Sequence, residues 1–524
     1  MADRKDVAEA AEATHIEGTT NESSALNQNA LKILWTNPTI LFASLFANLG
    51  SFMYGFDNTI LAMALPMVPF EKQFGTSYST SAGTSYIIPA HWQSLWNALA
   101  QVATGLGSFL VALISDSYGR RMSFFVAGII SAAGIAVLYV SAHPAVFLVG
   151  KIINGVALGM AIAAGQTYVA EVSPMKCRGI LLSIYIFSLY LGSLIGSIIA
   201  NSRVNIESDA GYKVMFSIGF IWAGLLVLFA WVVPESPIHW IRKEKVDKAR
   251  KAFQQLYTER ADIASILDEA IQTNNEEQEM RSTTREVGYI DCFRGTNWRR
   301  TRIVLYCNGV NQLLGSTFAG NGPYFLVNAG MTSKNATLVS EIGGALNCVS
   351  MLVVFYLLTQ FTRRSIILWG VSLCAVMFLP MGIAGCFPSS SAALWTIGIL
   401  MQAVTVLGFA PSIGPAAAVA AEIPQLRLKS KSQSIGFLFN FLFSTIWNAF
   451  VPYLFNADEA NLGGKMGFIF FATAVFSFAI LWYELPETKD ITYSQLDNLF
   501  HNRVPARQFR SAATEIEAFS NNKA

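Results

Sequence analysis

The sequence contains little charge for its length. Asp, Glu, Lys and Arg make up 13% of the 524 residues, whereas apolar residues make up 53%. Soluble domains carry about 25% charged residues, because their surfaces face water. The composition therefore favours a membrane protein. The formal net charge of +2 comes from bases scattered over short loops, so no nucleic-acid partner is expected.

Several chemical signatures are missing as well. The six cysteines have no paired spacing and the five histidines are dispersed, so neither a disulfide framework nor a metal site is expected. No nucleophile–base set or phosphate-binding loop stands out, so we expect neither an enzyme nor a bound cofactor. The first 38 residues are polar and lack the apolar core of a signal peptide. The first apolar run is then its own insertion signal.

Twelve apolar runs are long enough to cross a bilayer, which takes about 20 residues. They cover residues 39–66, 92–114, 122–142, 144–170, 180–201, 213–233, 301–328, 336–358, 364–386, 392–420, 432–455 and 463–484. The loops between them are short, except 234–300. In that loop, residues 246–257 and 263–271 have helical spacing and predict two short amphipathic helices, followed by a mobile polar link over 274–279.

Basic residues distinguish the two sides of the membrane. The positive-inside rule assigns base-rich loops to the cytosol. Such loops follow the second, fourth, eighth and tenth runs and contain Arg120, Arg121, Lys176, Arg178, Arg363, Arg364, Arg427, Lys429 and Lys431. Both termini are then cytosolic, in a multi-pass protein that we expect in the plasma membrane. The sequon Asn335-Ala-Thr337 falls on the exoplasmic side, where Asn335 can be glycosylated.

The charged hinges between the runs recur once, in the same order. Residues 115–121 are echoed by 359–364, Glu171 with Arg178 by Glu422 with Arg427, and Glu235 in Pro-Glu-Ser-Pro by Glu487 in Pro-Glu-Thr-Lys. A parallel repeat in an apolar chain predicts a two-lobed transporter with its substrate path between the lobes.

These hinges resemble those of the sugar porter family, a branch of the major facilitator superfamily, over about residues 35–495. The matching segments are Gly55-Phe56-Asp57, Asp116 to Arg121, Gly150-Lys151 with Gly155, Pro234 to Pro237 and Pro486 to Lys489. Residues 422–429 are similar to the fungal α-glucoside and related-metabolite branch. The resemblance implies an all-α integral membrane fold of twelve transmembrane helices in two six-helix bundles, alternating access and, often, proton symport.

The resemblance and the runs together divide the chain into five parts. We expect a disordered cytosolic N-terminus (1–38), a first six-helix bundle (39–233), a cytosolic linker with short helices (234–300), a second six-helix bundle (301–484) and a cytosolic tail (485–524).

Asp57 lies inside the first apolar run, where a charge costs about 2.5–3.5 kcal/mol near the middle of the membrane. Lys151, inside the fourth run, is its expected partner. Protonation of Asp57 from outside would break the pair and favour substrate binding. The resemblance implies this role, because the family uses the same acid with an arginine in place of the lysine. A static interhelical ion pair, or a Lys151 that reaches out to the interface, is the alternative.

The repeated charges are expected to form a gate at the cytosolic helix ends. In the first half, Asp116, Arg120 and Arg121 are expected to meet Glu171, Arg178 and Glu235. In the second half, Arg363, Arg364, Glu422, Arg427 and Glu487 remain, but Thr359, Gln360 and Thr362 depart from the family pattern. We therefore expect a weaker latch in the second half. The alternative is that these charges only set the topology.

Amide side chains mark a candidate substrate path. Asn311-Gln312 with Gly315 resembles the family's Gln-Gln-x-Ser-Gly, whose amides grip sugar hydroxyls, and the other candidates are Asn321, Tyr324, Asn347 and Asn440. Amides in apolar spans are costly unless satisfied, and a polyhydroxyl ligand would satisfy them. Interhelical hydrogen bonds, worth about 0.6 kcal/mol on average, are the alternative.

Three departures from the family bear on the substrate. Ile186 and Ala417 stand where the family has a glutamine and a tryptophan, and Ser444 stands where an amide is usual. The resemblance then implies a cavity that is wider and more apolar than a hexose site.

Three functions remain in competition. The first is a proton-coupled carrier whose partners are a small polyhydroxy substrate, such as a sugar or glycoside, protons and the lipid bilayer. The second is a carrier or exporter of a bulkier, less polar metabolite or organic acid. The third is a nutrient receptor on the same fold, although such receptors carry longer tails than 485–524. Uptake and export are not distinguished by the sequence.

Overall fold

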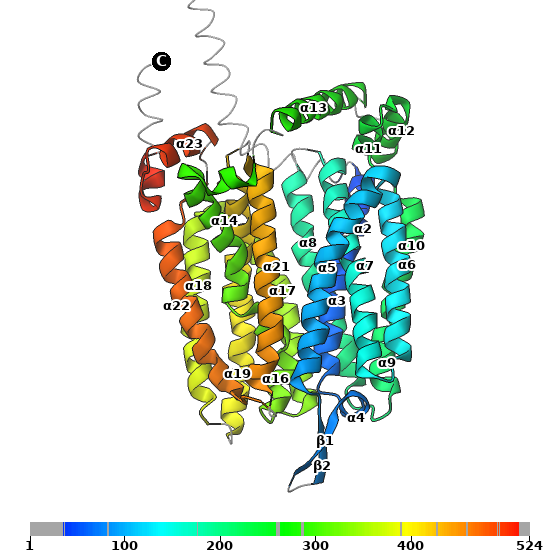
Figure 1. Cartoon of the computed structure of the whole chain (residues 1–524), viewed down its shortest axis with the longest axis vertical. Coiled ribbons are helices and arrows are strands. Elements are labelled where there is room, and N and C mark those ends of the chain that lie inside the picture. Colours follow the sequence, from blue (N-terminus) through cyan, green and yellow to red (C-terminus); the bar gives the residue numbers. More distant parts are fainter. Residues whose placement is uncertain are drawn as a thin grey trace, which may run out of the picture.

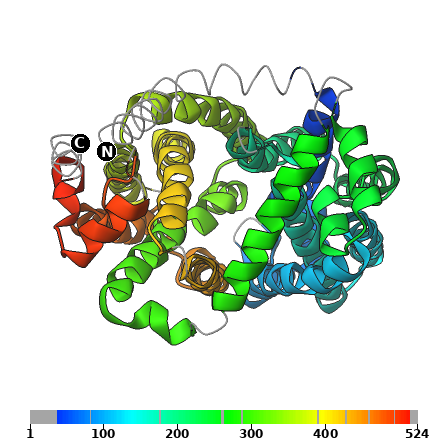
Figure 2. The same cartoon turned by 90° about the horizontal axis from the view of Figure 1, so that it is seen from above.

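The computed structural model describes residues 35, 37–80, 83–174, 177–257, 263–284, 288–387, 390–425, 428–456, 459–489, 491 and 493–512. The expected disordered segment 1–38 lies almost wholly outside them. Long helices run side by side along the molecule (Figure 1), and the view from above separates the helices of the first half of the chain from those of the second (Figure 2). The two-bundle arrangement predicted from the repeat is therefore present.

The first bundle is built from the N-terminal half of the chain. Its helices are α2 (Pro38–Ala47), α3 (Leu49–Ala64), α5 (Ala90–Tyr118), α6 (Arg120–Val140), α7 (Pro144–Val172), α8 (Arg178–Arg203), α9 (Ala210–Ser217) and α10 (Gly219–Val232). In its core, α7 packs against α5 and α6, while α3 packs against α8. Two glycines let these backbones touch, because a Cβ on Gly159 would lie 1.9 Å from the Thr104 carbonyl oxygen, and one on Gly192 would lie 2.1 Å from that of Phe52.

The second bundle repeats this plan with more irregular helices. It contains α14 (Gly295–Leu313), α15 (Ser316–Gly320), α16 (Gly322–Asn328), α17 (Ser333–Gln360), α18 (Arg363–Ala384), α19 (Ser391–Ala403), a π-helical turn (Val404–Phe409), α20 (Ala410–Glu422), α21 (Lys429–Phe455) and α22 (Met466–Glu484), which follows a 3-10 turn (Gly463–Lys465). The halves meet along two seams, where α5 packs against α21 and α8 packs against α17.

Eleven helical spans in the described part of the chain are long and apolar enough to cross a membrane. They match the predicted runs except the seventh, which the structure divides among α14, α15 and α16. The division occurs at Gly315, whose φ of 82° is strained for any residue with a side chain. A Cβ there would also lie 2.7 Å from the Phe470 ring. The seventh span is therefore a broken helix, a form found where backbone lines a cavity.

One short hairpin adds strands to this otherwise helical fold. After α3, helix α4 (Val68–Phe74) leads into an antiparallel hairpin of β1 (Thr76–Thr80) and β2 (Gly83–Ile87), in which Thr76 pairs with Ile87. The hairpin projects from one end of the bundles, which we call the hairpin end (Figure 1). The segment is rich in Thr and Tyr, which favour strands. The hairpin was not predicted, because the apolar runs on either side give no indication of it.

Short helices cover the opposite end, which we call the linker end (Figure 1). They are α11 (Pro237–Arg242), α12 (Val246–Leu256) and α13 (Ile263–Thr284), followed by a 3-10 turn (Tyr289–Phe293). Helix α12 confirms the amphipathic spacing of the sequence. The predicted link over 274–279 is wrong, because α13 continues through it to Thr284.

The C-terminal segment also folds at the linker end. Helix α23 (Tyr493–His501) and a 3-10 turn (Ala506–Gln508) pack beside α14 and α22. Arg300 of α14 anchors it, because this buried guanidinium lies 2.6 Å from the Asp497 carboxylate and over the Phe500 ring. Part of the expected cytosolic tail is therefore a docked helix.

Candidate substrate cavity and charge clusters

A cavity of about 570 Å³ lies between the two halves. Its walls come from α3, α5, α7 and α8 of the first half and from the broken seventh span, α17, α19, α20 and α21 of the second. The volume is in the range of small-molecule sites, about 300–1,000 Å³. Of the described residues that line it, the charged ones are Asp57 and Lys151.

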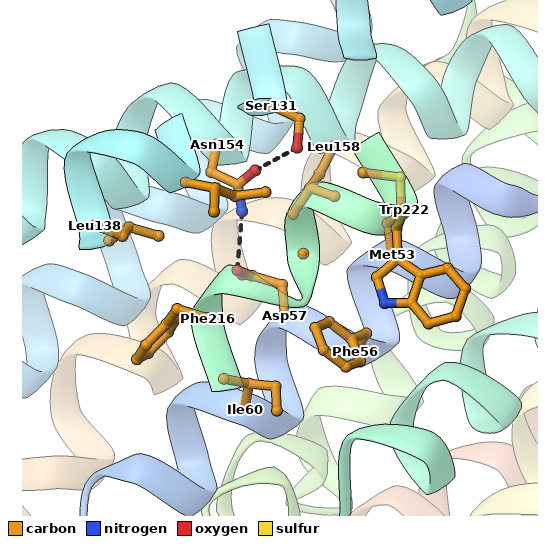
Figure 3. Close-up of a pocket in the computed structure, with 12 residues that line it drawn as sticks. Met53, Phe56, Asp57, Ile60, Ser131, Leu138, Asn154, Leu158, Phe216 and Trp222 are labelled. Atoms are coloured by element: carbon orange, nitrogen blue, oxygen red, sulfur yellow. Dashed lines mark hydrogen bonds between the residues drawn. The ribbon is translucent and has the colours of Figure 1, made fainter. Parts of the chain in front are cut away.

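The structure brings Asp57 and Lys151 together. The Lys151 ammonium of α7 lies 2.5 Å from Oδ2 of Asp57 on α3. The amide nitrogen of Asn154, one helical turn from Lys151, donates to Asp57 Oδ1 at 2.9 Å, and Asn154 in turn accepts from Ser131 Oγ at 2.8 Å (Figure 3). The Lys151 side chain is 2% exposed and that of Asp57 is 14% exposed, so the carboxylate is the more open member of the pair.

The break in the seventh span aims amides at the cavity. Gln312 Oε1 accepts from the hydroxyls of Ser316, at 3.2 Å, and Thr317, at 3.1 Å, which lie on the far side of the Gly315 turn. Its Nε2 donates to Asn440 of α21 at 3.4 Å. The side chain thus ties the two parts of the span to α21, and Gln312, Asn440 and Asn311 all line the cavity.

Two of these amides carry buried oxygens without a hydrogen-bond partner in the described part of the structure. They are Oδ1 of Asn311 and Oδ1 of Asn347. Asn347 also donates to Thr405 Oγ1 at 3.3 Å, and Asn321 donates to the Thr317 carbonyl at 2.9 Å. A buried acceptor left unpaired costs about 1–3 kcal/mol, so Asn311 and Asn347 gain from a ligand that donates hydrogen bonds.

Tyr324 is the predicted substrate residue that does not line the cavity. Its side chain is fully buried at the hairpin end, where its hydroxyl donates to Asn456 Oδ1 at 2.9 Å and accepts from Gln93 Nε2 at 2.8 Å. Asn456 also donates to the Ile88 carbonyl at 2.9 Å. Gln93 belongs to the first half and Tyr324 and Asn456 to the second, so this set, which we call the hairpin-end lock, joins the halves.

Other hydrogen bonds between the halves gather at the same end. Ser94 Oγ of α5 donates to the Ala449 carbonyl at 2.6 Å, and Asn201 of α8 donates to Glu341 of α17 at 2.7 Å. These residues lie near the ends of their helices that point toward the hairpin. The cavity is therefore closed off from the hairpin end by direct contacts.

The three departures from the family pattern all line the cavity, as expected from their alignment. They are Ile186 of α8, Ala417 of α20 and Ser444 of α21. Sequence reasoning missed other polar lining residues, among them Tyr54, Gln101 and Gln402. Tyr54 could have been found, since it lies three residues before Asp57 on the same helical face, and its hydroxyl donates to Gln101 Oε1 at 3.0 Å.

At the linker end, the first charge cluster surrounds Arg120. Its guanidinium lies 2.7 Å from Glu171 Oε1 and 3.9 Å from Asp116 Oδ1, and the side chains of Arg120 and Glu171 are 2% and 9% exposed. Arg242 of α11 reaches the same Glu171 oxygen at 3.3 Å. The cluster thus ties the linker helices to α7 and the α5–α6 turn.

Glu235 caps helix α6 from the linker. Its carboxylate accepts from the backbone N–H groups of Arg120, at 2.8 Å, and Arg121, at 3.2 Å. The first N–H groups of a helix lack partners and favour a negative charge. Gly119 is required at this turn, because its φ is 98° and a Cβ would lie 2.3 Å from Glu235 Oε2.

One expectation for this cluster was wrong in detail. The Arg121 guanidinium does not pair with Glu171 or Glu235 but donates to the carbonyls of Ala230, at 2.8 Å, and Trp231, at 2.7 Å. These carbonyls belong to the last turn of α10, where a cation is favourable. Arg178 begins α8, and its side chain lies outside the described residues.

The second charge cluster copies the first. Arg363 pairs with Glu422, Glu487 accepts from the backbone N–H groups of Arg363, at 3.2 Å, and Arg364, at 3.0 Å, and Arg364 donates to the Trp482 carbonyl at 2.8 Å. The Arg363 and Glu422 side chains are 25% and 31% exposed, so this pair is more open to water than Arg120 and Glu171. Arg427 lies outside the described residues.

His239 of α11 completes the first cluster. Its buried ring lies 3.0 Å from an Arg120 guanidinium nitrogen through Nδ1. Burial, together with the positive charge of Arg120, lowers the pKa of His239 to about 4. A neutral ring can accept a hydrogen bond from the guanidinium, whereas a protonated ring would repel it.

Asn335 lies in the first turn of α17 at the hairpin end, and its backbone N–H donates to Thr332 Oγ1 at 3.4 Å. The Thr337 hydroxyl of the same sequon is buried and bonds to Asn201 and to backbone carbonyls. The expected exoplasmic loop is therefore the beginning of a helix.

Known transporters resemble this chain in sequence. Residues 43–500 match the family described as "Sugar (and other) transporter". The chain is 28% identical over 470 residues to the MFS transporter fmqE of Aspergillus fumigatus. The aligned region covers 89% of this chain and 87% of the relative. It is 27% identical over 510 residues to the general alpha-glucoside permease of Saccharomyces cerevisiae, covering 96% of this chain and 81% of the permease.

Among solved structures, the xylose transporter XylE of E. coli in its inward-open conformation is similar. It superposes with a TM-score of 0.67 at 20% sequence identity, over 88% of this chain and 99% of XylE. This similarity is one of fold.

Proposed function

Because this chain belongs to the Sugar (and other) transporter family, we propose that it is a secondary active transporter that carries a sugar, a glycoside or a similar polyhydroxy metabolite by alternating access. The observation that carries the proposal is the central cavity, where amides from both halves surround a single charged pair. A polyhydroxyl ligand can donate to the unpaired oxygens of Asn311 and Asn347. The names of the alpha-glucoside permease and the xylose transporter support a sugar-like substrate.

We propose proton coupling at Asp57. In the deprotonated state, the carboxylate holds α7 through Lys151 and Asn154. A proton on Asp57 removes the charge that Lys151 neutralises and leaves a buried ammonium without its counter-ion, which is costly. The contact between α3 and α7 then loosens beside the substrate. A static ion pair would keep the same geometry without titrating during transport.

We further propose that the hairpin end faces the exterior and the linker end faces the cytosol. The base-rich loops lie at the linker end, which agrees with the positive-inside rule. In that orientation the hairpin-end lock closes the exterior side, and the two charge clusters hold the cytosolic helix ends of the two lobes, 39–233 and 301–484. Residence in the plasma membrane, cytosolic termini and glycosylation of Asn335 belong to the same proposal.

A second candidate is a carrier of a bulkier, less polar metabolite. The specific observation in its favour is the apolar part of the cavity wall, where Ile186 and Ala417 replace polar and aromatic family residues and Phe409, Ile413 and Phe437 lie nearby on the same lining. Such a substrate would occupy the apolar side of the cavity and contact the amides at one edge.

The test is uptake in a host without endogenous transporters. A panel of radiolabelled hexoses, disaccharides, glycosides and apolar metabolites is measured with and without a protonophore. Protonophore-sensitive accumulation of a polyhydroxy compound supports the proposal. Accumulation of apolar metabolites alone favours the second candidate, and protonophore-insensitive transport contradicts the coupling.

A further inference from the structure

A second, smaller pocket borders Asp57, and Lys151 is not among the described residues that line it (Figure 3). Its volume is about 20 Å³, and Asp57 lines both this pocket and the central cavity. Most of its wall is apolar, made by residues such as Phe56, Ile135 and Phe216. The polar exceptions besides Asp57 are Ser131, Asn154 and Trp222.

Trp222 contributes a hydrogen-bond donor to this wall. Its indole Nε1 is buried and has no hydrogen-bond partner in the described part of the structure. The ring is held edge-on against Phe52 and Phe56, with centroid distances of 4.6 and 6.1 Å. Trp222 and Asp57 both line the pocket (Figure 3). A buried donor left unpaired costs about 1–3 kcal/mol, so the site favours an acceptor beside Trp222.

The size and chemistry of the pocket fit one water molecule. A buried water needs a cavity of at least about 10–15 Å³ and two to four polar partners. The indole N–H can donate to it. The Asp57 carboxylate and the Asn154 carbonyl oxygen can accept from it, because each keeps a free lone pair after the bonds from Lys151, Asn154 and Ser131.

We propose that this pocket binds a single water molecule between the Trp222 indole N–H and the Asp57 carboxylate, and that Trp222 is thereby a positioning residue for proton coupling. The inference rests on the proposed function, since it gives the coupling carboxylate a third contact. A water that donates to Asp57 stabilises its charged form. Loss of the water removes this hydrogen bond from the charged form.

The other titratable groups around Asp57 lie on the side of the central cavity, not in the small pocket. Lys151 faces it from α7, and the tyrosines Tyr54 and Tyr185 line the cavity on α3 and α8. The pocket residues contributed by α6, α9 and α10 carry no titratable side chain. A water that bridges Trp222 and Asp57 would therefore add an uncharged contact to the hydrogen bond that Asn154 already donates.

The test uses Trp222→Phe, which removes the N–H and keeps an aromatic ring against Phe52 and Phe56. We expect the pH of half-maximal uptake to rise by about one unit, the equivalent of one hydrogen bond to a charged group. Trp369→Phe, on the outer face of α18, is the matched control and leaves the profile unchanged. Ile135→Phe places a larger apolar side chain in the pocket wall while leaving Trp222 and Asp57 unsubstituted, and it is expected to shift the profile in the same direction.

The outcomes separate the inference from the proposed function. An unchanged pH profile in both Trp222→Phe and Ile135→Phe, at normal membrane expression, overturns the water site. If wild-type uptake does not depend on the proton gradient, the proposed coupling is wrong. The water site is then tested by the electron density in the pocket. A high-resolution structure then decides: a density peak within hydrogen-bond distance of Trp222 Nε1 and Asp57 supports the site, and an empty pocket overturns it.

Discussion

Lys151 places its ammonium 2.5 Å from Oδ2 of Asp57 and thereby joins α7 to α3 beside the central cavity. The pair is asymmetric, because Lys151 lines only the cavity whereas Asp57 lines both the cavity and the small pocket. The Asp57 side chain is also the more exposed of the two, at 14% against 2% for Lys151. A lysine ammonium is a point charge without the fork of an arginine, and Asn154 supplies a second hydrogen bond to the carboxylate.

Tyr324→Phe is expected to weaken the hairpin-end lock. The substitution keeps the ring but removes the hydroxyl that joins Gln93 to Asn456. Leaving these buried amides less well paired costs the closed state about 1–3 kcal/mol. A cysteine placed at Ala319, in the cavity wall, should then react faster with an impermeant thiol reagent from outside. Tyr453→Phe, a partly exposed tyrosine of α21, is the control, and equal reactivity in both variants would contradict the lock.

Ala417→Trp is expected to shift specificity toward smaller, hexose-like substrates. Ala417 lines the cavity on α20, so the indole would fill its apolar side and provide a stacking surface. Competition assays against the preferred wild-type substrate measure the shift. Ala392→Trp, on the exposed face of α19, is the control. An unchanged order of preference would mean that this wall does not contact the substrate.

Arg120→Ala is expected to destabilise the protein more than Arg363→Ala. Arg120 is buried against Glu171, and removing it leaves a buried carboxylate, at a cost of about 3 kcal/mol or more. Arg363 and Glu422 are partly exposed, so the loss there is about 1 kcal/mol or less. Thermal unfolding of both variants in the same detergent compares them. Equal or reversed losses would show that exposure does not distinguish the two clusters.

His239 predicts a loss of stability in acid. Its folded-state pKa of about 4 lies below the ordinary value of 6.5, so the unfolded chain binds the proton more tightly. The contribution of neutral His239 is therefore complete above pH 6.5 and is lost as the pH falls from 6.5 toward 4. Unfolding temperatures across this window should fall less steeply for His239→Gln than for the wild type. Parallel curves would assign the acid sensitivity to other groups.

The long apolar runs and the repeated hinges predicted the two-lobed membrane fold well, because hydrophobic length and charge position are local properties of a sequence. The pairing of Asp57 with Lys151 also followed, since a charge within a span requires a partner. Arg120 and Arg121 show the limit of this reasoning. Adjacent bases in one hinge point to different targets, a carboxylate and two helix carbonyls, and only the helix directions decide between them.

The break at Gly315 and the place of Tyr324 were not predictable from the same signals. From the sequence alone, Gly315 could be a glycine that only allows close helix packing. Its positive φ and its contact with the Phe470 ring are known only from the structure. Tyr324 follows the candidate amides in sequence, but it lies on α16, beyond the break, and its hydroxyl accepts a hydrogen bond from Gln93 of the other half. The hairpin was missed because nothing in the runs marks a structure between them.

Proton flux through purified protein tests the central claim most directly. Protein in liposomes with an internal pH dye receives external substrate, and the wild type should acidify the interior together with substrate uptake. Asp57→Asn should exchange labelled for unlabelled substrate at a comparable rate but carry no protons and accumulate nothing, because the amide keeps the shape and cannot titrate. Asp209→Asn, at an exposed pair with Lys213, should match the wild type. Substrate-dependent acidification by Asp57→Asn would contradict the assignment of Asp57 as the coupling group.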